Sequence, residues 1–282
     1  MRSEHAPNVD LKTVEGFGEE WAAFDQEALE DAEYSMLFGN YFAVFPFDRL
    51  PANAEGFDLG CGTGRWALGV APRVGALHCI DPSPKALEVA RRRLGHLSNV
   101  TFSEARADTM PLGDCSQDFG YSLGVLHHIP DTGAAMAAAV RKLRPGAPFL
   151  VYLYYAFDNR PAWFRWVWKS TEWARWAISR LPFAMRKMVT TIIAATIYWP
   201  LSRFAWLLEK WGLDVANIPL SDYRHRAFYS LRTDALDRFG TRLEQRFTRE
   251  QIITMMTDAG LAEILFHEGV PHWVACGRKK GG

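Results

Sequence analysis

Short apolar runs recur along much of the chain, and segments with helical spacing lie between them. Strands are predicted at residues 55–59, 76–80, 99–103, 116–123 and 148–155. Residues 84–94 place apolar side chains at positions 86, 87, 90 and 94, which predicts an amphipathic helix. A second helix is predicted from Thr132 to Lys142, because Asp131 and Thr132 offer a helix start.

A helix and two strands are predicted to close the chain. The helix covers residues 247–260, with Thr248 as N-cap, Gln251 completing a capping box and Gly260 as the stop. Strands are predicted at residues 261–266 and 273–277.

The part ahead of the first strand has a helical and aromatic pattern. Residues 1–16 are expected to be frayed, and residues 17–50 to be helical and rich in Trp, Tyr and Phe. Pro46 and Pro51 are expected to end this segment.

Residues 158–245 carry a different pattern. Eight of the eleven tryptophans fall between Trp163 and Trp211, on segments that are apolar around most of a helix with basic residues interleaved. Pro182 and Pro200 are expected to divide this region into three helices, and residues 234–242 to form a tight turn.

Composition narrows the function classes. The 282 residues are 49% hydrophobic and 23% charged with no formal net charge, so no basic excess suggests a nucleic-acid partner. The four cysteines are scattered, which favours a reduced cytoplasmic setting and predicts neither a metal site nor a disulfide framework. The N-terminus lacks the apolar core of a signal peptide, and no run is expected to reach the ~18 apolar residues that span a bilayer.

A glycine-rich turn follows the first predicted strand. Gly60, Gly62 and Gly64 come directly after Phe57-Asp58-Leu59, an arrangement that lets the backbone pass close to a nucleotide-like ligand. The dinucleotide fingerprint would need glycine at position 65, where this chain has Arg65. The ligand is therefore expected to have no pyrophosphate.

Asp58-Leu-Gly-Cys-Gly-Thr-Gly64 resembles motif I of the class I S-adenosylmethionine-dependent methyltransferases. Gly124-Val-Leu-His-His-Ile-Pro-Asp131 and the final helix–Ala-Gly-Leu–strand–strand order also resemble small-molecule members, of the type 11 kind. The resemblance implies an α/β fold with a Rossmann-like seven-stranded sheet, a helical N-terminal segment (1–51) and a helical insertion (158–245) between strands five and six. It assigns the core to residues 52–157 and 246–282.

The resemblance also implies S-adenosylmethionine as cofactor, held by Asp58, Gly60, Cys61, Gly62, Gly64, Asp81, Asp108, Thr109 and Gly124. Asp81 would accept hydrogen bonds from the ribose hydroxyls, which suits an ionised carboxylate, although it could instead only cap the next helix. Asp108 and Thr109 would lie at the adenine edge, although Asp108 could be a plain loop residue.

Two histidines are the candidates for catalysis. A hydroxyl acceptor must lose a proton during methyl transfer, and an imidazole is a suitable base near neutral pH. His127 and His128 follow the fourth predicted strand, at the sheet edge where ligands bind in open α/β folds, although one of them could only pack there. The substrate-binding candidates are Tyr41, Tyr223, His225 and Arg226, and the last three could instead dock the insertion through ion pairs.

The function that the sequence favours is methyl transfer to a small-molecule acceptor at a hydroxyl oxygen. Two alternatives stay open: methylation of a membrane-associated quinone or lipid-linked sugar, and non-catalytic binding of the cofactor. The insertion is interpreted as a cap over the site, a membrane-surface element, or a dimer interface or plain packing. The expected partners are a small, apolar or lipid-linked substrate and a peripheral membrane contact, with no nucleic acid, and the expected location is the cytoplasm or its membrane face.

Overall fold

The computed structural model describes residues 7–24 and 31–281. The chain divides into two compact units. The sheet unit comprises residues 1–25, 36–156 and 243–282, and the helical unit comprises residues 26–35 and 157–242. The division falls inside helix α2 (Asp31–Tyr41) and close to residues 156 and 242.

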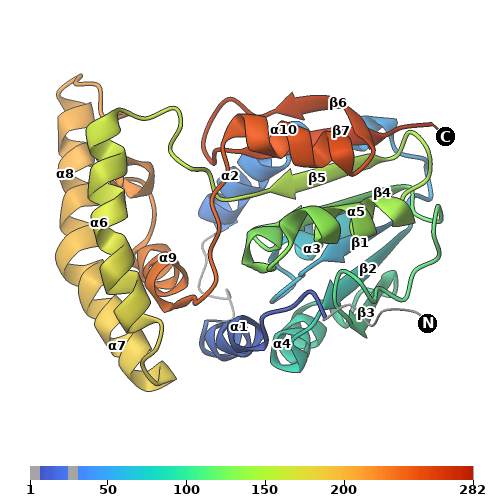
Figure 1. Ribbon diagram of the computed structural model, residues 1–282, viewed down its shortest axis with the longest axis horizontal. Helices are drawn as coiled ribbons and strands as arrows, with labels where there is room; N and C mark the ends of the chain where they lie inside the picture. Colours follow the sequence, from blue (N-terminus) through green and yellow to red (C-terminus); the bar gives the residue numbers. More distant parts are fainter. Residues whose placement is uncertain (1–6, 25–30, 282) are drawn as a thin grey trace. The chain divides into compact units, whose positions relative to one another are not determined.

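The sheet unit is built on seven strands (Figure 1). They are β1 (Glu55–Leu59), β2 (Ala76–Asp81), β3 (Val100–Glu104), β4 (Phe119–Leu123), β5 (Pro148–Tyr152), β6 (Leu261–Phe266) and β7 (Val274–Lys279). Their order across the sheet is β3-β2-β1-β4-β5-β7-β6, and β7 runs antiparallel to both of its neighbours. This confirms the predicted α/β fold with a Rossmann-like sheet.

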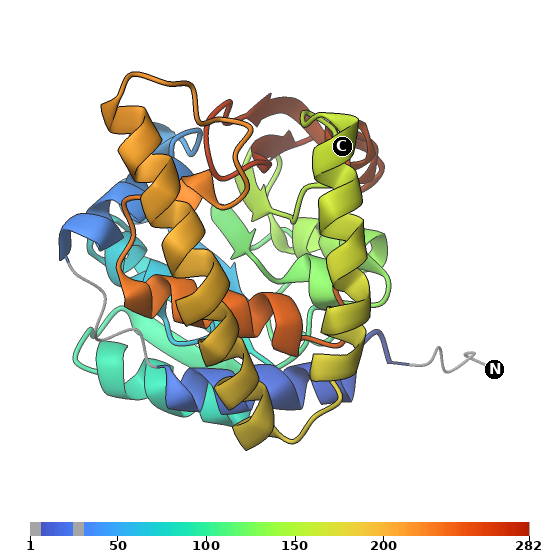
Figure 2. The same ribbon diagram turned by 90° about the vertical axis from the view of Figure 1, so that its left-hand side faces the viewer.

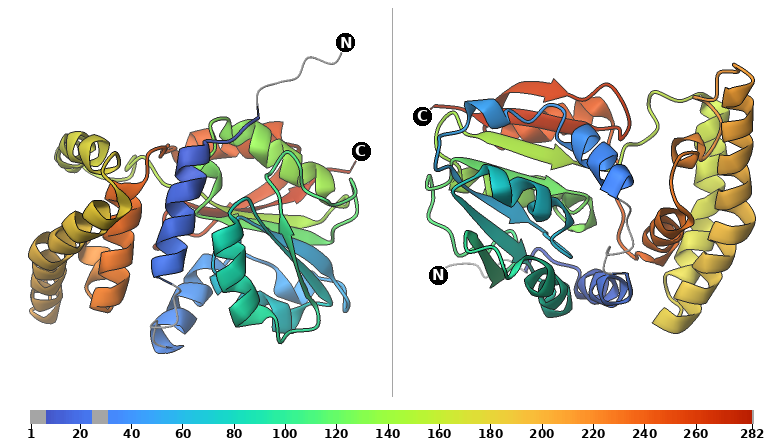
Figure 3. Two further views of the ribbon diagram at one scale, coloured as in Figure 1. Left: turned by 90° about the horizontal axis from the view of Figure 1, so that it is seen from below. Right: turned by 180° about the vertical axis from the view of Figure 1, so that it is seen from behind.

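Helices cover both faces of this sheet. Helices α5 (Thr132–Lys142) and α10 (Arg249–Asp258) pack on each other and on β1, β5 and β7, while α3 (Arg65–Val70) covers the opposite face (Figures 1 and 3). Phe57 and Leu59 of β1 alternate with Asp58 and pack into the cluster under α5. The predicted capping box of α10 is confirmed, since the Thr248 and Gln251 side chains each accept from the other's backbone N–H.

The N-terminal helices differ from the prediction at their start. Helix α1 (Leu11–Ala23) begins within the segment that was expected to be frayed. Asp10 explains the early start, because its carboxylate accepts from the backbone N–H of Thr13 at 2.8 Å and so caps the first turn. Residues 1–6 lie outside the described residues. A short 3-10 turn (Phe47–Arg49) then leads into β1.

The helical unit contains α6 (Ala162–Ile178), α7 (Phe183–Ile193), α8 (Trp199–Lys210) and α9 (Phe228–Gly240). The prediction that Pro200 separates two helices is wrong. A π-helical turn (Ala194–Tyr198) joins α7 and α8 into one helix, Phe183–Lys210, in which Pro200 occupies the first turn of α8. A local change of hydrogen-bond spacing lets a helix continue past a residue that has no N–H.

This long helix also overturns the expectation about membrane-spanning length. By length and composition alone, Phe183–Lys210 could cross a membrane. Residues 234–242 are likewise not a tight turn, because most of them belong to α9. Leu231, Ala235 and Phe239 are four residues apart and are buried together against Ala194 and Tyr198, which stabilises a helix there.

Candidate functional site

The glycine turn after β1 has a backbone that other residues would strain. Gly60, Gly62 and Gly64 have φ angles of 78°, 53° and 74°. A Cβ on Gly60 would stand 2.4 Å from the Val125 side chain, and one on Gly64 would stand 2.4 Å from that of Leu94. The positive φ angles and the lack of room for a Cβ atom therefore both require glycine at positions 60 and 64.

Asp81 connects this turn to the end of β2. Its Oδ2 accepts from the backbone N–H of Gly62 at 2.9 Å, and its Oδ1 accepts from that of Ser83 at 2.8 Å. Ser83, not Asp81, is the N-cap of α4 (Pro84–Leu94). Burial raises the pKa of Asp81 to about 6, while the two backbone hydrogen bonds oppose that shift. Each oxygen keeps lone pairs with which it can accept from a ligand hydroxyl.

Asp58 on β1 is a second buried carboxyl. It is 1% exposed, and its Oδ2 has no hydrogen-bond partner among the described residues. Burial raises its pKa to about 8; the nearby Tyr121 hydroxyl opposes that shift, and the neighbouring Asp81 carboxylate adds to it. A buried carboxyl oxygen without a partner suits a ligand that carries a positive charge.

Helix α1 lies over the same sheet edge. The indole nitrogen of Trp21 is 3.3 Å from the place where a Cβ on Gly62 would stand. Phe17 packs on His128 with ring centroids 4.7 Å apart, and Gly18 lies so close to Ser83 that a Cβ there would be 2.5 Å from its Oγ. The loops after β1, β2 and β4 are thus all contacted by one helix.

The two histidines follow β4 in a 3-10 turn (Leu126–His128). His128 donates through Nδ1 to the backbone carbonyl of Leu243 at 2.7 Å. His127 is fully buried, and neither of its ring nitrogens has a hydrogen-bond partner among the described residues. Burial lowers the pKa of His127 well below its usual range, and the charges of His128 and Arg246 lower it further. His127 is therefore neutral at physiological pH.

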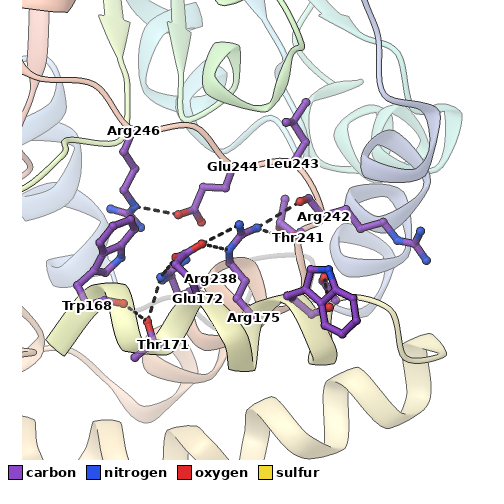
Figure 4. A network of polar contacts seen from close by, with 12 residues as sticks. Trp168, Thr171, Glu172, Arg175, Arg238, Thr241, Arg242, Leu243, Glu244 and Arg246 are labelled. Carbon is purple, nitrogen blue, oxygen red and sulfur yellow. Dashed lines mark hydrogen bonds and ion pairs between the residues drawn. The ribbon is translucent and has the colours of Figure 1, made fainter. Parts of the chain in front are cut away.

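Aromatic rings and a buried ion pair surround His127. The Tyr154 ring stacks on it with centroids 3.9 Å apart, and the Tyr152 ring stands edge-on at 6.5 Å. The Arg246 guanidinium lies 5.1 Å from the Tyr154 ring and pairs with Glu244 at 2.8 Å (Figure 4). Sequence reasoning missed Tyr154, Glu244 and Arg246, because they come from segments about ninety residues apart.

A family comparison identifies the first five strands. A family model described as a methyltransferase domain matches residues 57–151, which extend from β1 into β5. Residues 57–151 are therefore a class I S-adenosylmethionine-dependent methyltransferase domain. The predicted family and cofactor are thereby confirmed, and Asp58 and Asp81 are buried carboxyls that fit the positive charge and the ribose hydroxyls of that cofactor.

The methyltransferase domain is similar to curated proteins over part of their length. An uncharacterised 37.1 kDa protein in transposon TN4556 of Streptomyces fradiae is 37% identical over 134 residues, which cover 45% of this chain and 37% of that protein. Methyltransferase GfsG of Streptomyces halstedii is 35% identical over 106 residues, which cover 36% of this chain and 38% of GfsG. The chain thus spans less than two fifths of the length of these relatives.

A solved structure shows the same fold. N-methyltransferase NodS from Bradyrhizobium japonicum, in complex with S-adenosylhomocysteine, has a TM-score of 0.52 at 15% identity. The match covers 96% of this chain and 100% of that one. Relatives of the domain are named for methylation at oxygen, carbon and nitrogen, so the family leaves the acceptor atom open.

The structure places the remaining candidate residues of the sheet unit around this edge. Cys61 is buried in the glycine turn, and Gly124 directly follows β4 with a φ angle of 79°. Asp108 and Thr109 are exposed after β3, where Asp108 accepts from the Arg106 guanidinium at 3.0 Å. Tyr41 packs against Tyr152 at 5.0 Å.

Tyr223, His225 and Arg226 belong to the helical unit and have partners inside it. His225 pairs with Glu209 at 2.9 Å, and Arg226 pairs with Asp234 at 3.0 Å. The Arg226 guanidinium also lies 4.7 Å from the Tyr223 ring. These contacts connect the segment to α8 and α9.

Proposed function

We propose that this protein transfers a methyl group from S-adenosylmethionine to the hydroxyl oxygen of a small aromatic or otherwise apolar molecule. The observation that carries the proposal is a neutral, fully buried His127 at the edge where Asp81 meets the glycine turn. The cofactor supplies a methyl group on a positively charged sulfur.

The residues that would hold the cofactor are those of the first two strands. The glycine turn would allow close approach of the ligand to the backbone, and Asp81, which already accepts from the Gly62 N–H, would accept from the two ribose hydroxyls. Asp58 balances the positive charge of the ligand, because its buried oxygen otherwise has no hydrogen-bond partner among the described residues.

His127 would take the proton of the acceptor. Its neutral ring can accept, and its nitrogens are not occupied by other described residues. A lowered pKa makes it a weak base, yet the oxygen becomes far more acidic as it gains the methyl group. The proton can therefore pass to His127 late in the displacement. Alignment of the acceptor with the methyl group supplies the rest of the acceleration.

The aromatic surroundings indicate the kind of acceptor. Tyr41, Tyr152 and Tyr154 lie next to one another with ring centroids 5.0 Å and 5.7 Å apart, and two of them contact His127. Rings in this arrangement favour a flat apolar molecule through edge and face contacts.

Cofactor binding tests the first half of the proposal. Titration calorimetry with S-adenosylhomocysteine should show binding by the natural chain and an affinity lower by at least about tenfold for Asp81→Asn, because charge-assisted hydrogen bonds are lost. Asp114→Asn is the matched control, since Asp114 is an exposed carboxylate that pairs with Lys142. The proposal fails if the natural chain does not bind or if the two variants bind equally.

Turnover tests the second half. S-adenosylhomocysteine release is measured with paired aromatic acceptors that differ only in carrying a hydroxyl or an amino group. Hydroxyl acceptors should be methylated, and His127→Gln should remove that turnover while cofactor binding persists. Turnover on the amino acceptors alone would show that the oxygen assignment is wrong.

A further inference from the structure

Helix α6 and the long helix formed by α7 and α8 expose many large apolar side chains. Trp173 is 80% exposed, and Trp166 and Trp211 are each 73% exposed. Trp176, Met188 and Phe204 are also more than half exposed. Contiguous exposed apolar side chains of this size mark a binding surface in soluble proteins.

These side chains form stripes along the two helices. On α6, positions 163, 166, 167 and 173 recur at helical spacing, and on the long helix positions 185, 188 and 192 do the same. The opposite side of the long helix is occupied, because Ala194 and Tyr198 are buried with Leu231 and Phe239 of α9. Figure 2 shows α6 and the long helix in front of α9, which crosses behind both. The exposed apolar side chains of α6 and of the long helix are together called the Trp face below.

Basic residues predominate in the segment that carries the Trp face. Residues 162–213 contain eight basic and two acidic residues. Both acids are neutralised inside the helical unit. Glu172 pairs with Arg175 at 2.8 Å and Arg238 at 2.6 Å (Figure 4), and Glu209 pairs with Arg224 at 2.7 Å and His225 at 2.9 Å.

The exposed cations, by contrast, have no carboxylate partner. Arg165, Lys169, Arg180 and Lys210 are exposed and form no ion pair with any described residue. Two of them lie over indoles: the Arg180 guanidinium is 4.3 Å from the Trp176 ring, and the Lys210 ammonium is 3.7 Å from the Trp206 ring. Tryptophan beside Lys or Arg on an amphipathic helix is suited to the headgroup zone of a bilayer.

We propose that the Trp face docks on the surface of an anionic phospholipid bilayer, with its indoles at the headgroup level and its cations on lipid phosphates. This goes beyond the methyl transfer proposed above and rests only on the helical unit. It makes the protein a peripheral membrane protein, able to meet an acceptor that is dissolved in lipid.

Packing of the long helix favours lying on the bilayer over crossing it. Thr190 and Ser202 are buried on its inner side together with Ala194 and Tyr198. A spanning helix would have to leave α9, expose the apolar side of α9 and carry Arg203 into the membrane. Docking by the outer side alone leaves these contacts intact.

Vesicle flotation of the whole chain tests the proposal. We expect strong binding to vesicles of phosphatidylcholine and phosphatidylglycerol in equal parts, much weaker binding to phosphatidylcholine alone, and loss of the difference at high salt. Trp166→Glu/Trp173→Glu should weaken binding to the mixed vesicles by at least about tenfold, because two indoles leave the lipid. Leu265→Glu is the matched control, because Leu265 is 62% exposed on β6 of the sheet unit, and it should bind as the natural chain does.

Three results would overturn the proposal. The first is absence of binding to the mixed vesicles, or equal binding by the double variant. The second is a dimer in lipid-free sedimentation that the double variant dissociates, which would assign the Trp face to a second copy of the chain. The third is retention in the membrane after alkaline carbonate washing, which would show a spanning helix. S-adenosylhomocysteine binding in the same preparations separates each of these from a failure of the methyltransferase proposal.

Discussion

At the scale of single residues, the site is marked by buried polar groups that lack partners among the described residues. Asp58 and His127 are both almost completely buried, and burial shifts each pKa towards the neutral form. Such groups destabilise a folded chain unless a ligand uses them. Their protonation should therefore respond to ligand binding.

Asp58 should lose its proton when the cofactor binds. Its pKa of about 8 keeps the carboxyl mostly protonated at pH 7, and a nearby positive charge lowers the pKa of a carboxyl. Calorimetry at pH 7 in buffers of different ionisation enthalpy should therefore report release of about one proton per site. Asp58→Asn should abolish the proton release. A binding enthalpy of the natural chain that does not change with the buffer would show that Asp58 does not lose a proton on binding.

Stability of the free protein should depend on pH through the same group. A carboxyl whose pKa rises from 3.8 unfolded to about 8 folded stabilises the fold fully only below pH 3.8. That stability is lost as the pH rises towards 8. Urea unfolding should therefore show a lower free energy of unfolding at pH 8 than at pH 5, with a smaller difference in Asp58→Asn. An equal pH dependence in the two proteins would show that Asp58 is not the group responsible.

His127 should govern the acid side of the rate profile. Because its pKa lies well below 6.5, kcat should persist at pH 6, where an ordinary histidine is mostly charged. His127→Gln should lower kcat by about 10²- to 10⁴-fold with little change in cofactor affinity. His96→Gln, at an exposed position, is the control and should leave both unchanged. A natural enzyme that loses activity near pH 6.5 would exclude His127 as the base.

At the scale of elements, the position of α1 connects the fold to the site. Its contact with α4 depends on Gly18, because no other residue fits against Ser83 without a shift. The same helix brings Trp21 to the glycine turn and Phe17 to His128. A change at Gly18 should therefore act on cofactor binding without altering any residue proposed to bind it.

Gly18→Ala should lower the affinity for S-adenosylhomocysteine several-fold, since its Cβ would stand 2.5 Å from the Ser83 oxygen. Ser83→Ala removes that oxygen. The double variant Gly18→Ala/Ser83→Ala should therefore lose less affinity for S-adenosylhomocysteine than the two single variants lose in sum. Gly39→Ala on α2 is the matched control, because a Cβ there meets nothing within 4 Å. Additive effects of the two single changes would show that α1 does not depend on this contact.

At the scale of the whole molecule, the chain divides into two units, and each has a hydrophobic core cluster of its own. The sheet unit carries the proposed cofactor residues, and the helical unit carries the Trp face. Two ligands of different chemistry should therefore protect different parts of the chain.

Hydrogen exchange with mass spectrometry should show this division. S-adenosylhomocysteine should slow exchange at residues 55–64 and 76–83, while mixed vesicles should slow it at residues 163–211. Each ligand alone should leave the other region nearly unchanged. Protection of the 163–211 region by S-adenosylhomocysteine alone would show that the two functions share one site.

Much of the fold could be predicted from local pattern. The strands and the helices that follow them are specified by apolar periodicity, and the turn at Gly60, Gly62 and Gly64 by residues that alone tolerate its φ angles. The capping box at Thr248 and Gln251 was predicted for the same reason, because it depends on four consecutive residues. Asp58 and Asp81 became candidates because each lies on a strand beside the turn.

Tertiary structure decided what depends on distant segments. The long helix continues past Pro200, and residues 234–240 are helical, because both segments pack together in the core of the helical unit. The surroundings of His127 likewise require β5 and the segment after residue 242 to meet beside β4. Periodicity records which side of an element is apolar, whereas only the folded chain decides which elements those sides meet.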